Sequence, residues 1–205
     1  PDPYCRRLVQ AIATHEQVPA SYVLCGNGAA DLIYTYCAAL RPRTAVEPAP
    51  TFAEYGLGLA QVGCRVTPYF LHQAENFDVD EGFLPFLEEK KPEAVFLCTP
   101  NNPTGVVYSA DTLTRMAAIL TEKSAQYGHN IFLVSDEPYR DIVFDGKTVP
   151  YPAAFYPHTL TCFSFSKSLS LPGERLGYVA VRPGCEGEEV LLKVKRDRIG
   201  SLFSS

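Results

Sequence analysis

The chain has 205 residues, of which 46% are hydrophobic and 20% charged, and its formal net charge at pH 7 is −5. This composition is typical of globular proteins large enough to bury a core. The negative charge, the lack of a basic cluster and the lack of a long apolar run argue against a nucleic-acid partner and a membrane span.

Short β-rich runs alternate with longer helical patterns, which indicates a doubly wound α/β fold. Strands are expected at residues 22–25, 44–47, 65–70, 94–98, 131–135, 159–165 and 176–181. Helices are expected at residues 4–16, 29–40, 52–61, 81–90 and 110–127, and a charged helix begins near residue 186. The run from 131 to 135 is almost entirely apolar, as expected where helices cover both faces of a parallel sheet.

The two ends of the chain suggest a part of a longer protein. The sequence opens on Pro1 rather than Met, and it stops at Ser205 within a helical pattern. Because it contains no internal repeat, low-complexity tract or linker, we expect one domain over residues 1–205, excised from a longer polypeptide.

The seven cysteines form no Cys-x-x-Cys pair, and most of them lie inside apolar runs. This pattern favours reduced, buried thiols in a cytoplasmic protein without disulfides or a zinc site. The four histidines lack metal-ligand spacing, so we expect them at the surface and expect no metal.

Polar residues follow four of the expected strands. These are Gly26-Asn27-Gly28 after 22–25, Asn101-Asn102 after 94–98, Asp136 and Tyr139 after 131–135, and Lys167 after 159–165. Open α/β sheets bind ligands outside the carboxyl ends of their strands. The sequence therefore predicts a ligand site at that edge.

Lys167 is the leading candidate for covalent chemistry. It ends the run Ser164-Phe165-Ser166-Lys167, and Arg175 follows eight residues later. A lysine amine forms a Schiff base with an aldehyde, while hydroxyls and a guanidinium hold a phosphate, so the run fits a phosphorylated aldehyde cofactor. A solvated surface lysine is the ordinary alternative. Its apolar neighbours predict partial burial, which lowers the pKa of a lysine amine and makes it nucleophilic.

Asp136 and Tyr139 are candidates for holding the cofactor ring. Asp136 directly follows an apolar strand, so it is either a turn-capping residue or the partner of a protonated pyridine nitrogen. Tyr139 would hydrogen-bond the phenolate oxygen of the ring, or would simply pack. Asn102, before Pro103-Thr104-Gly105, is by itself an ordinary turn residue.

Gly26-Asn27-Gly28-Ala29-Ala30 opens a helix whose free N–H groups suit a phosphate. The spacing matches neither a Walker loop nor a dinucleotide fingerprint, which argues against ATP and NAD.

Taken together, Asn101 to Gly105, Ser135 to Tyr139 and Ser164 to Arg175 resemble the fold-type I pyridoxal-phosphate enzymes, specifically the class I/II aminotransferases. The resemblance implies a three-layer α/β/α fold with a mostly parallel seven-stranded sheet, namely the large cofactor-binding domain. It implies that a tyrosine reaching the partner's cofactor precedes Pro1, that a small domain follows Ser205, and that the enzyme is a homodimer.

The same resemblance assigns roles to individual residues. Asn102 joins Tyr139 at the phenolate oxygen, and Phe52 stacks on the pyridine ring. The phosphate is held by the Gly28, Ala29 and Ala30 amides together with Ser164, Ser166 and Arg175.

The resemblance differs between the two halves of the chain. The first half is similar to histidinol-phosphate aminotransferases and threonine-phosphate decarboxylases, and the second to aspartate-type aminotransferases. We therefore expect a pyridoxal-5'-phosphate-dependent aminotransferase of amino-acid metabolism, moving an amino group between an amino acid and a 2-oxo acid through a Schiff base on Lys167. A decarboxylase of a phosphorylated amino acid and a non-catalytic cofactor-binding regulatory module are the alternatives.

Overall fold

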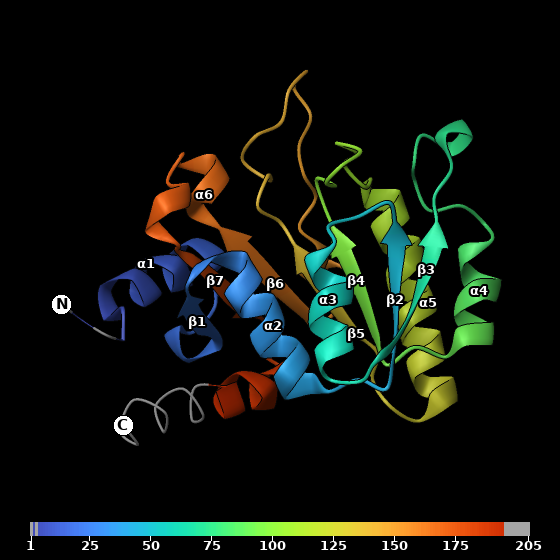
Figure 1. Cartoon of the computed structure of the whole chain (residues 1–205), viewed down its shortest axis with the longest axis horizontal. Helices are drawn as coiled ribbons and strands as arrows, with labels where there is room; N and C mark the ends of the chain where they lie inside the picture. Colours follow the sequence, from blue (N-terminus) through green and yellow to red (C-terminus); the bar gives the residue numbers. More distant parts are fainter. Residues whose placement is uncertain (1, 3, 195–205) are drawn as a thin grey trace.

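A seven-stranded sheet forms the centre of the molecule (Figure 1). The computed structural model describes residue 2 and residues 4–194. The strands are β1 (Val23–Gly26), β2 (Thr44–Ala49), β3 (Arg65–Phe70), β4 (Ala94–Cys98), β5 (Phe132–Asp136), β6 (Thr159–Ser164) and β7 (Gly177–Val181). Their order is β1-β7-β6-β5-β4-β2-β3.

Only β7 runs against its neighbours. It pairs antiparallel with β1 and with β6, while the pairs from β6 across to β3 are parallel. Six strands therefore end at the same edge of the sheet, which we call the carboxyl edge. Because β7 is reversed, its first residue lies at this edge too, paired with Gly26 and Ser164.

Helices cover both faces of the sheet. They are α1 (Arg6–Glu16), α2 (Gly28–Leu40), α3 (Glu54–Gln61), α4 (Phe83–Lys90), α5 (Ala110–Tyr127) and α6 (Phe165–Ser168), and residues 187–194 are also helical. Single 3₁₀ turns occur at Ala20–Tyr22, Gln73–Glu75, Pro152–Ala154 and Pro172–Glu174. No helix in the described part of the chain is both long and apolar enough to cross a bilayer.

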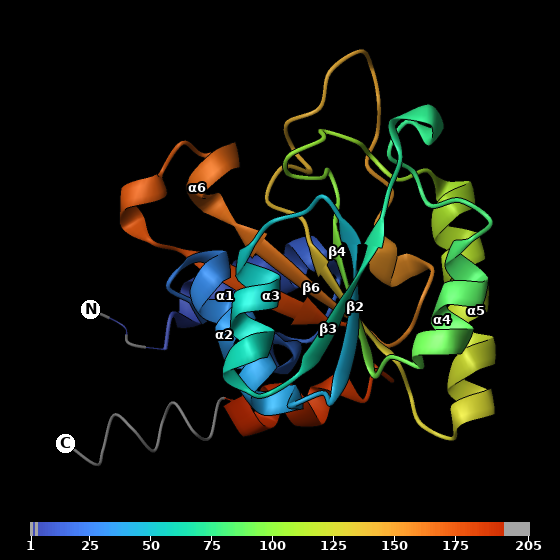
Figure 2. The ribbon, with the colours of Figure 1, turned by 45° about the vertical axis from the view of Figure 1, so that its right-hand side comes forward.

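The core is divided by the sheet. On one face α2, α3 and the helix at 187–194 bury one cluster, and on the other face α1 buries a second and α4 and α5 bury a third. Figure 2 shows α2 and α3 on the opposite side of the sheet from α4 and α5. The expected three-layer α/β/α fold with a mostly parallel seven-stranded sheet is confirmed.

Local sequence explains the best-defined elements. All five residues of β4 are buried, which matches its uninterrupted apolar run. The Ser109 side chain accepts a hydrogen bond from the Thr112 N–H at the start of α5, and Gly128 ends that helix with φ 73°. The predicted bounds of β3, β4 and α5 are confirmed residue for residue.

The predicted end of the sixth strand at Phe165 is wrong by one residue, and α6 was not predicted. The strand ends at Ser164, because the Ser164 side chain accepts a hydrogen bond from the Ser166 N–H and starts a helical turn. Lys167 therefore lies on a helix directly after the strand.

Candidate active site

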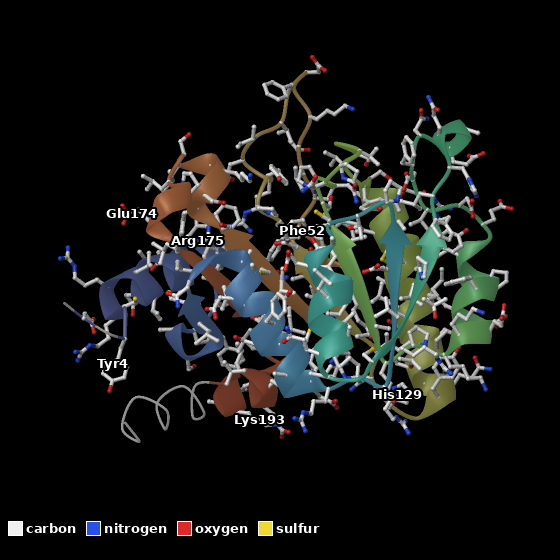
Figure 3. All side chains as sticks on the ribbon, in the orientation of Figure 1. Tyr4, Phe52, His129, Glu174, Arg175 and Lys193 are labelled. Atoms are coloured by element: carbon white, nitrogen blue, oxygen red, sulfur yellow. The ribbon has the colours of Figure 1, made fainter. Side chains whose placement is uncertain are left out.

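The carboxyl edge brings together groups from distant parts of the chain. Gly26 ends β1, Asp136 ends β5 and Ser164 ends β6. In Figure 3, Phe52 and Arg175 lie toward this edge, whereas His129 and Lys193 lie at the opposite one.

The start of α2 and Arg175 form a cup. Gly28 is buried with φ +84°, and a Cβ atom there would lie only 2.8 Å from Nη2 of Arg175. Gly177 is equally confined, since a Cβ atom on it would lie 2.7 Å from the Phe163 carbonyl oxygen. Glycine is therefore required at both positions. The closeness of Arg175 to Gly28 places its guanidinium directly over the first turn of α2.

The hydroxyls of Ser164 and Ser166 lie 2.9 Å apart at the end of β6, the strand next to β7. Arg175 is exposed, and its Nη1 donates to the Pro172 carbonyl at 3.2 Å. Ala29 and Ala30, in the first turn of α2, are half-buried. Helix N–H groups, a guanidinium and two hydroxyls are the donors that a phosphate dianion requires, so the cup fits one.

Asp136 lies in register between Cys98 of β4 and Cys162 of β6. It is 2% exposed, and its Oδ2 accepts a hydrogen bond from the Tyr55 hydroxyl at 2.7 Å. Its Oδ1 is buried and has no hydrogen-bond partner. Burial raises the pKa of the Asp136 carboxyl to about 6, while the Tyr55 hydroxyl and the Cys162 thiol oppose that rise.

A buried carboxylate oxygen without a donor is costly, so this oxygen is available to a donor from a ligand. The protonated nitrogen of a pyridine ring supplies one N–H donor and a positive charge. The environment of Asp136 therefore fits pyridoxal phosphate.

Lys167 and Tyr139 are neighbours, with the lysine Nζ 5.6 Å from the centre of the tyrosine ring. Tyr139 and Asn102 line the same hollow of about 480 Å³. The expected partial burial of Lys167 is wrong, because the side chain is exposed. It lies on a single helical turn that projects beyond the sheet rather than in the strand itself.

Phe52, just before α3, is half-buried and meets the Tyr55 ring edge-on, with centroids 5.7 Å apart. The structure thus gathers Gly28, Arg175, Ser164 and Ser166 in one cup. It pairs Lys167 with Tyr139, and Tyr139 with Asn102.

Two groups of functional interest were missed from the sequence. The first is Tyr55, which lies three residues after Phe52 on a helix that was predicted. No local sequence pattern indicates that its partner is Asp136. The second is a buried network of Glu16, Glu137, Arg140 and Tyr178, which we call the arginine network.

In the arginine network, Arg140 pairs with Glu16, donates to the Tyr178 hydroxyl at 2.7 Å, and lies 3.6 Å from Oε2 of Glu137. Tyr178 in turn donates to Glu16 at 2.5 Å. Burial raises the pKa of Glu137 to about 8, although Arg140 lowers it.

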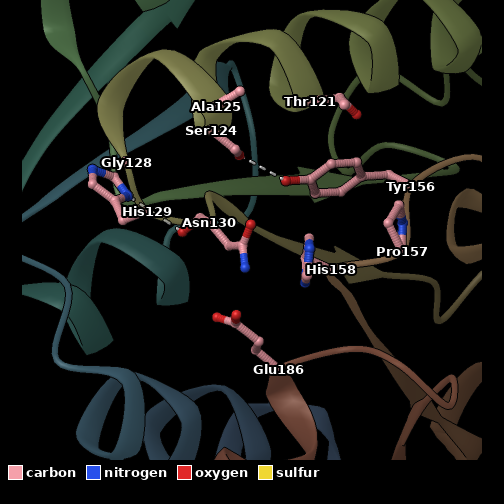
Figure 4. A pocket seen from close by; sticks show the side chains of 10 residues that line it. All are labelled: Thr121, Ser124, Ala125, Gly128, His129, Asn130, Tyr156, Pro157, His158 and Glu186. Atoms are coloured by element: carbon pink, nitrogen blue, oxygen red, sulfur yellow. Dashed lines mark hydrogen bonds between the residues drawn. The ribbon is translucent and has the colours of Figure 1, made fainter.

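A second pocket, of about 630 Å³, lies at the amino ends of β5 and β6 (Figure 4). Tyr156 there donates to the Ile131 carbonyl at 2.7 Å. The expectation that all histidines are at the surface is wrong for His158, which is half-buried with a buried, unpartnered Nδ1, because its ring packs against Phe132 and Tyr156. None of the predicted site residues lines this pocket.

All seven cysteines are free thiols, and burial raises the pKa of Cys98 to about 12. Within residues 2 and 4–194, no group of three or more His, Cys, Asp or Glu side chains is arranged to hold a metal.

Comparisons with known proteins agree with this chemistry. A family model described as aminotransferase class I and II matches residues 5–205. The chain is 37% identical over 185 residues to threonine-phosphate decarboxylase of Salmonella typhimurium, covering 87% of this chain and 47% of that protein. It is 30% identical over 180 residues to histidinol-phosphate aminotransferase of Thermoanaerobacter sp. strain X514, and the match covers 87% of this chain and 48% of that protein.

Among solved structures, an aminotransferase from Eubacterium rectale matches with a TM-score of 0.82 and 32% identity, over 97% of this chain and 51% of that one. The chain spans about half the length of the curated relatives it matches.

Proposed function

Because this chain belongs to the class I and II aminotransferase family, whose members use pyridoxal 5'-phosphate, we propose that it is the large cofactor-binding domain of an aminotransferase. The substrates would be an amino acid and a 2-oxo acid. The observation that carries the proposal is the unpartnered Oδ1 of buried Asp136, at the same edge as Lys167 and the cup of Gly28 and Arg175.

When bound, pyridoxal phosphate withdraws electrons from the Cα atom of the amino acid, so that a bond to this carbon breaks more easily. Lys167 Nζ would hold the aldehyde carbon until an amino acid replaces it, and would then move the proton of the substrate Cα. Oδ1 of Asp136 would accept the hydrogen bond of the ring nitrogen and balance its charge.

The remaining residues would orient the ring. Tyr139 and Asn102 would hydrogen-bond its phenolate oxygen, and Phe52 would stack on it. The cup would hold the phosphate through Arg175, Ser164 and Ser166 and through the amides of Gly28, Ala29 and Ala30.

A second candidate is a decarboxylase of a phosphorylated amino acid, and the 37% identity to threonine-phosphate decarboxylase favours it. The residues described above serve both reactions, because the orientation of the substrate decides which bond at Cα breaks. Assays of the full-length protein with threonine phosphate and with common amino acids separate the two, since one releases carbon dioxide and the other a 2-oxo acid.

The decisive variant is Lys167→Ala in the full-length protein. We expect turnover to fall by about 10²–10⁴-fold, because the general base is lost. Borohydride reduction followed by peptide mapping is expected to label Lys167 in the unsubstituted protein. Lys193→Ala, at the opposite edge in Figure 3, is the matched control and is expected to keep full activity. Undiminished turnover in Lys167→Ala refutes the proposal, and cofactor binding without turnover of any amino acid favours a regulatory module.

We also propose that the enzyme is a cytoplasmic homodimer, in line with the family resemblance. Sedimentation of the full-length protein with its cofactor tests the dimer directly, and fractionation of cells tests the compartment.

A further inference from the structure

Tyr55 is a fully buried residue of α3 whose hydroxyl reaches the site. Its ring lies between Phe52 and Phe96, each with a centroid 5.7 Å away. The aromatic packing on both sides fixes the direction of the ring. The hydroxyl consequently has a defined position, from which it donates to Oδ2 of Asp136 at 2.7 Å.

This hydrogen bond makes the two oxygens of Asp136 different. Oδ2 is occupied by a donor from the protein, whereas Oδ1 is buried without one. A carboxylate with no fixed partner could rotate and present either oxygen. With Oδ2 held, only Oδ1 is left for a ligand.

We propose that Tyr55 is a positioning residue, which holds Oδ2 of Asp136 so that Oδ1 faces the ring nitrogen of the bound cofactor. The inference rests on the proposed function only for the identity of the ligand. The effect on the carboxyl is a property of the protein without cofactor.

The groups around Asp136 favour this role. Burial raises the pKa of Asp136 to about 6, and the bond from Tyr55 opposes that rise. The pKa of Tyr55 is itself raised well above its ordinary value, first by burial and then by the Asp136 charge, so the hydroxyl remains a donor. The thiols of Cys98 and Cys162, on the two neighbouring strands, also have raised pKa values and remain neutral. Glu137, whose own pKa is raised to about 8, is the other carboxyl that the Asp136 charge affects.

The experiment measures the pKa of the Asp136 carboxyl in the full-length protein without cofactor. Carbon-13 NMR of aspartate labelled at the side-chain carboxyl follows the titration, and Asp136→Asn assigns the signal. In Tyr55→Phe we expect the Asp136 pKa to rise by about one to two units, since the bond it loses is made to an ionised group. We expect the dissociation constant of added pyridoxal phosphate to rise about tenfold, because a carboxyl free to rotate is no longer preorganised for its ligand.

Tyr156→Phe is the matched control. It also removes a buried tyrosine hydroxyl with a 2.7 Å hydrogen bond, but at the amino ends of β5 and β6; Figure 4 shows this hydroxyl beside Ser124, to which it is also hydrogen-bonded. A purely structural role of Tyr55 predicts that both variants lose thermal stability and that neither moves the Asp136 titration. That result overturns the proposal.

A failure of the proposed function can be told apart from a failure of the proposal for Tyr55. A full-length protein that takes up no pyridoxal phosphate refutes the function, while the titration still decides the role of Tyr55. Should Tyr55→Phe not fold, replacing tyrosine by a fluorinated tyrosine provides a stronger donor of similar shape. The Asp136 pKa is then expected to fall, and an unmoved titration overturns the proposal.

Discussion

Two neighbouring carboxyls at the end of β5 are buried in different ways. Asp136 points toward α3, where its Oδ2 accepts a hydrogen bond from the neutral Tyr55 hydroxyl, and its Oδ1 has no partner. Glu137 lies on the opposite face, where Ser135 donates to it at 2.9 Å and Arg140 supplies a positive charge. Burial raises the pKa of both.

This contrast suits different roles for the two carboxyls, with Asp136 binding a ligand and Glu137 supporting the structure. Among the described residues, no cation shifts the pKa of Asp136, whereas Arg140 lowers that of Glu137. A countercharge from outside the protein therefore suits Asp136, whereas Glu137 has Arg140 beside it, although its buried Oε2 likewise has no hydrogen-bond partner. Three substitutions test this difference.

The largest effect is expected for Arg140→Met. Removing the guanidinium leaves Glu16 buried without a countercharge and takes a donor from the Tyr178 hydroxyl, which is expected to destabilise the protein by about 3–5 kcal/mol. Urea unfolding at pH 7 measures the loss. Arg115→Met, which breaks an exposed pair with Asp111, is the control and should change stability by about 0.5 kcal/mol or less. Equal losses in the two variants would show that the arginine network is not a structural unit.

Asp136→Asn is expected to separate stability from function. The folded pKa of Asp136, about 6, exceeds the reference value of 3.8, so the folded protein binds this proton more tightly than the unfolded chain. The resulting stability is fully present below pH 3.8 and is lost as the pH rises through about 6. The asparagine side chain of the variant does not titrate. Relative to the unsubstituted protein, the variant should therefore gain about 2.4 kcal/mol between pH 4 and pH 7.

The same variant should lose about 10²–10³-fold in turnover, because the proposed electrostatic partner of the ring nitrogen is gone. Urea unfolding at the two pH values and an activity assay on the loaded protein give the two readouts. A stability difference that is the same at pH 4 and pH 7 would contradict the raised pKa.

The smallest effect is expected for Ser135→Ala. It removes the 2.9 Å hydrogen bond to Oε1 of Glu137 and should cost about 1 kcal/mol in unfolding free energy at pH 7. Affinity for pyridoxal phosphate, measured by absorbance, should not change, because Glu137 faces away from the proposed site. Weaker cofactor binding with unchanged stability would reverse the assignment of the two acids.

Much of the fold follows from local pattern. The apolar run of β4 and the apolar first three residues of β5 could be recognised because both faces of the sheet are covered. The four polar segments after strands were placed at one edge by a general rule for α/β sheets. The antiparallel insertion of β7 could not be derived from local pattern, since strand order depends on contacts between distant segments.

The features of the site that could not be predicted are a contact between residues far apart in the sequence and a helix of only four residues. The Tyr55–Asp136 bond joins residues 81 positions apart, and no local pattern encodes it. The four-residue helix α6 is shorter than the window over which periodicity is visible, so Lys167 was assigned the surroundings of a strand end.

The reversed strand β7 also has a consequence for biosynthesis. Arg175, two residues before the first residue of β7, is expected to reach Gly28 only once β7 has inserted between β1 and β6. On a ribosome the chain emerges from its amino end, so Asp136 and Lys167 leave the exit tunnel before this insertion is possible. If the proposed site is correct, we therefore expect a nascent polypeptide that already carries Lys167 to retain pyridoxal phosphate only after β7 is in place.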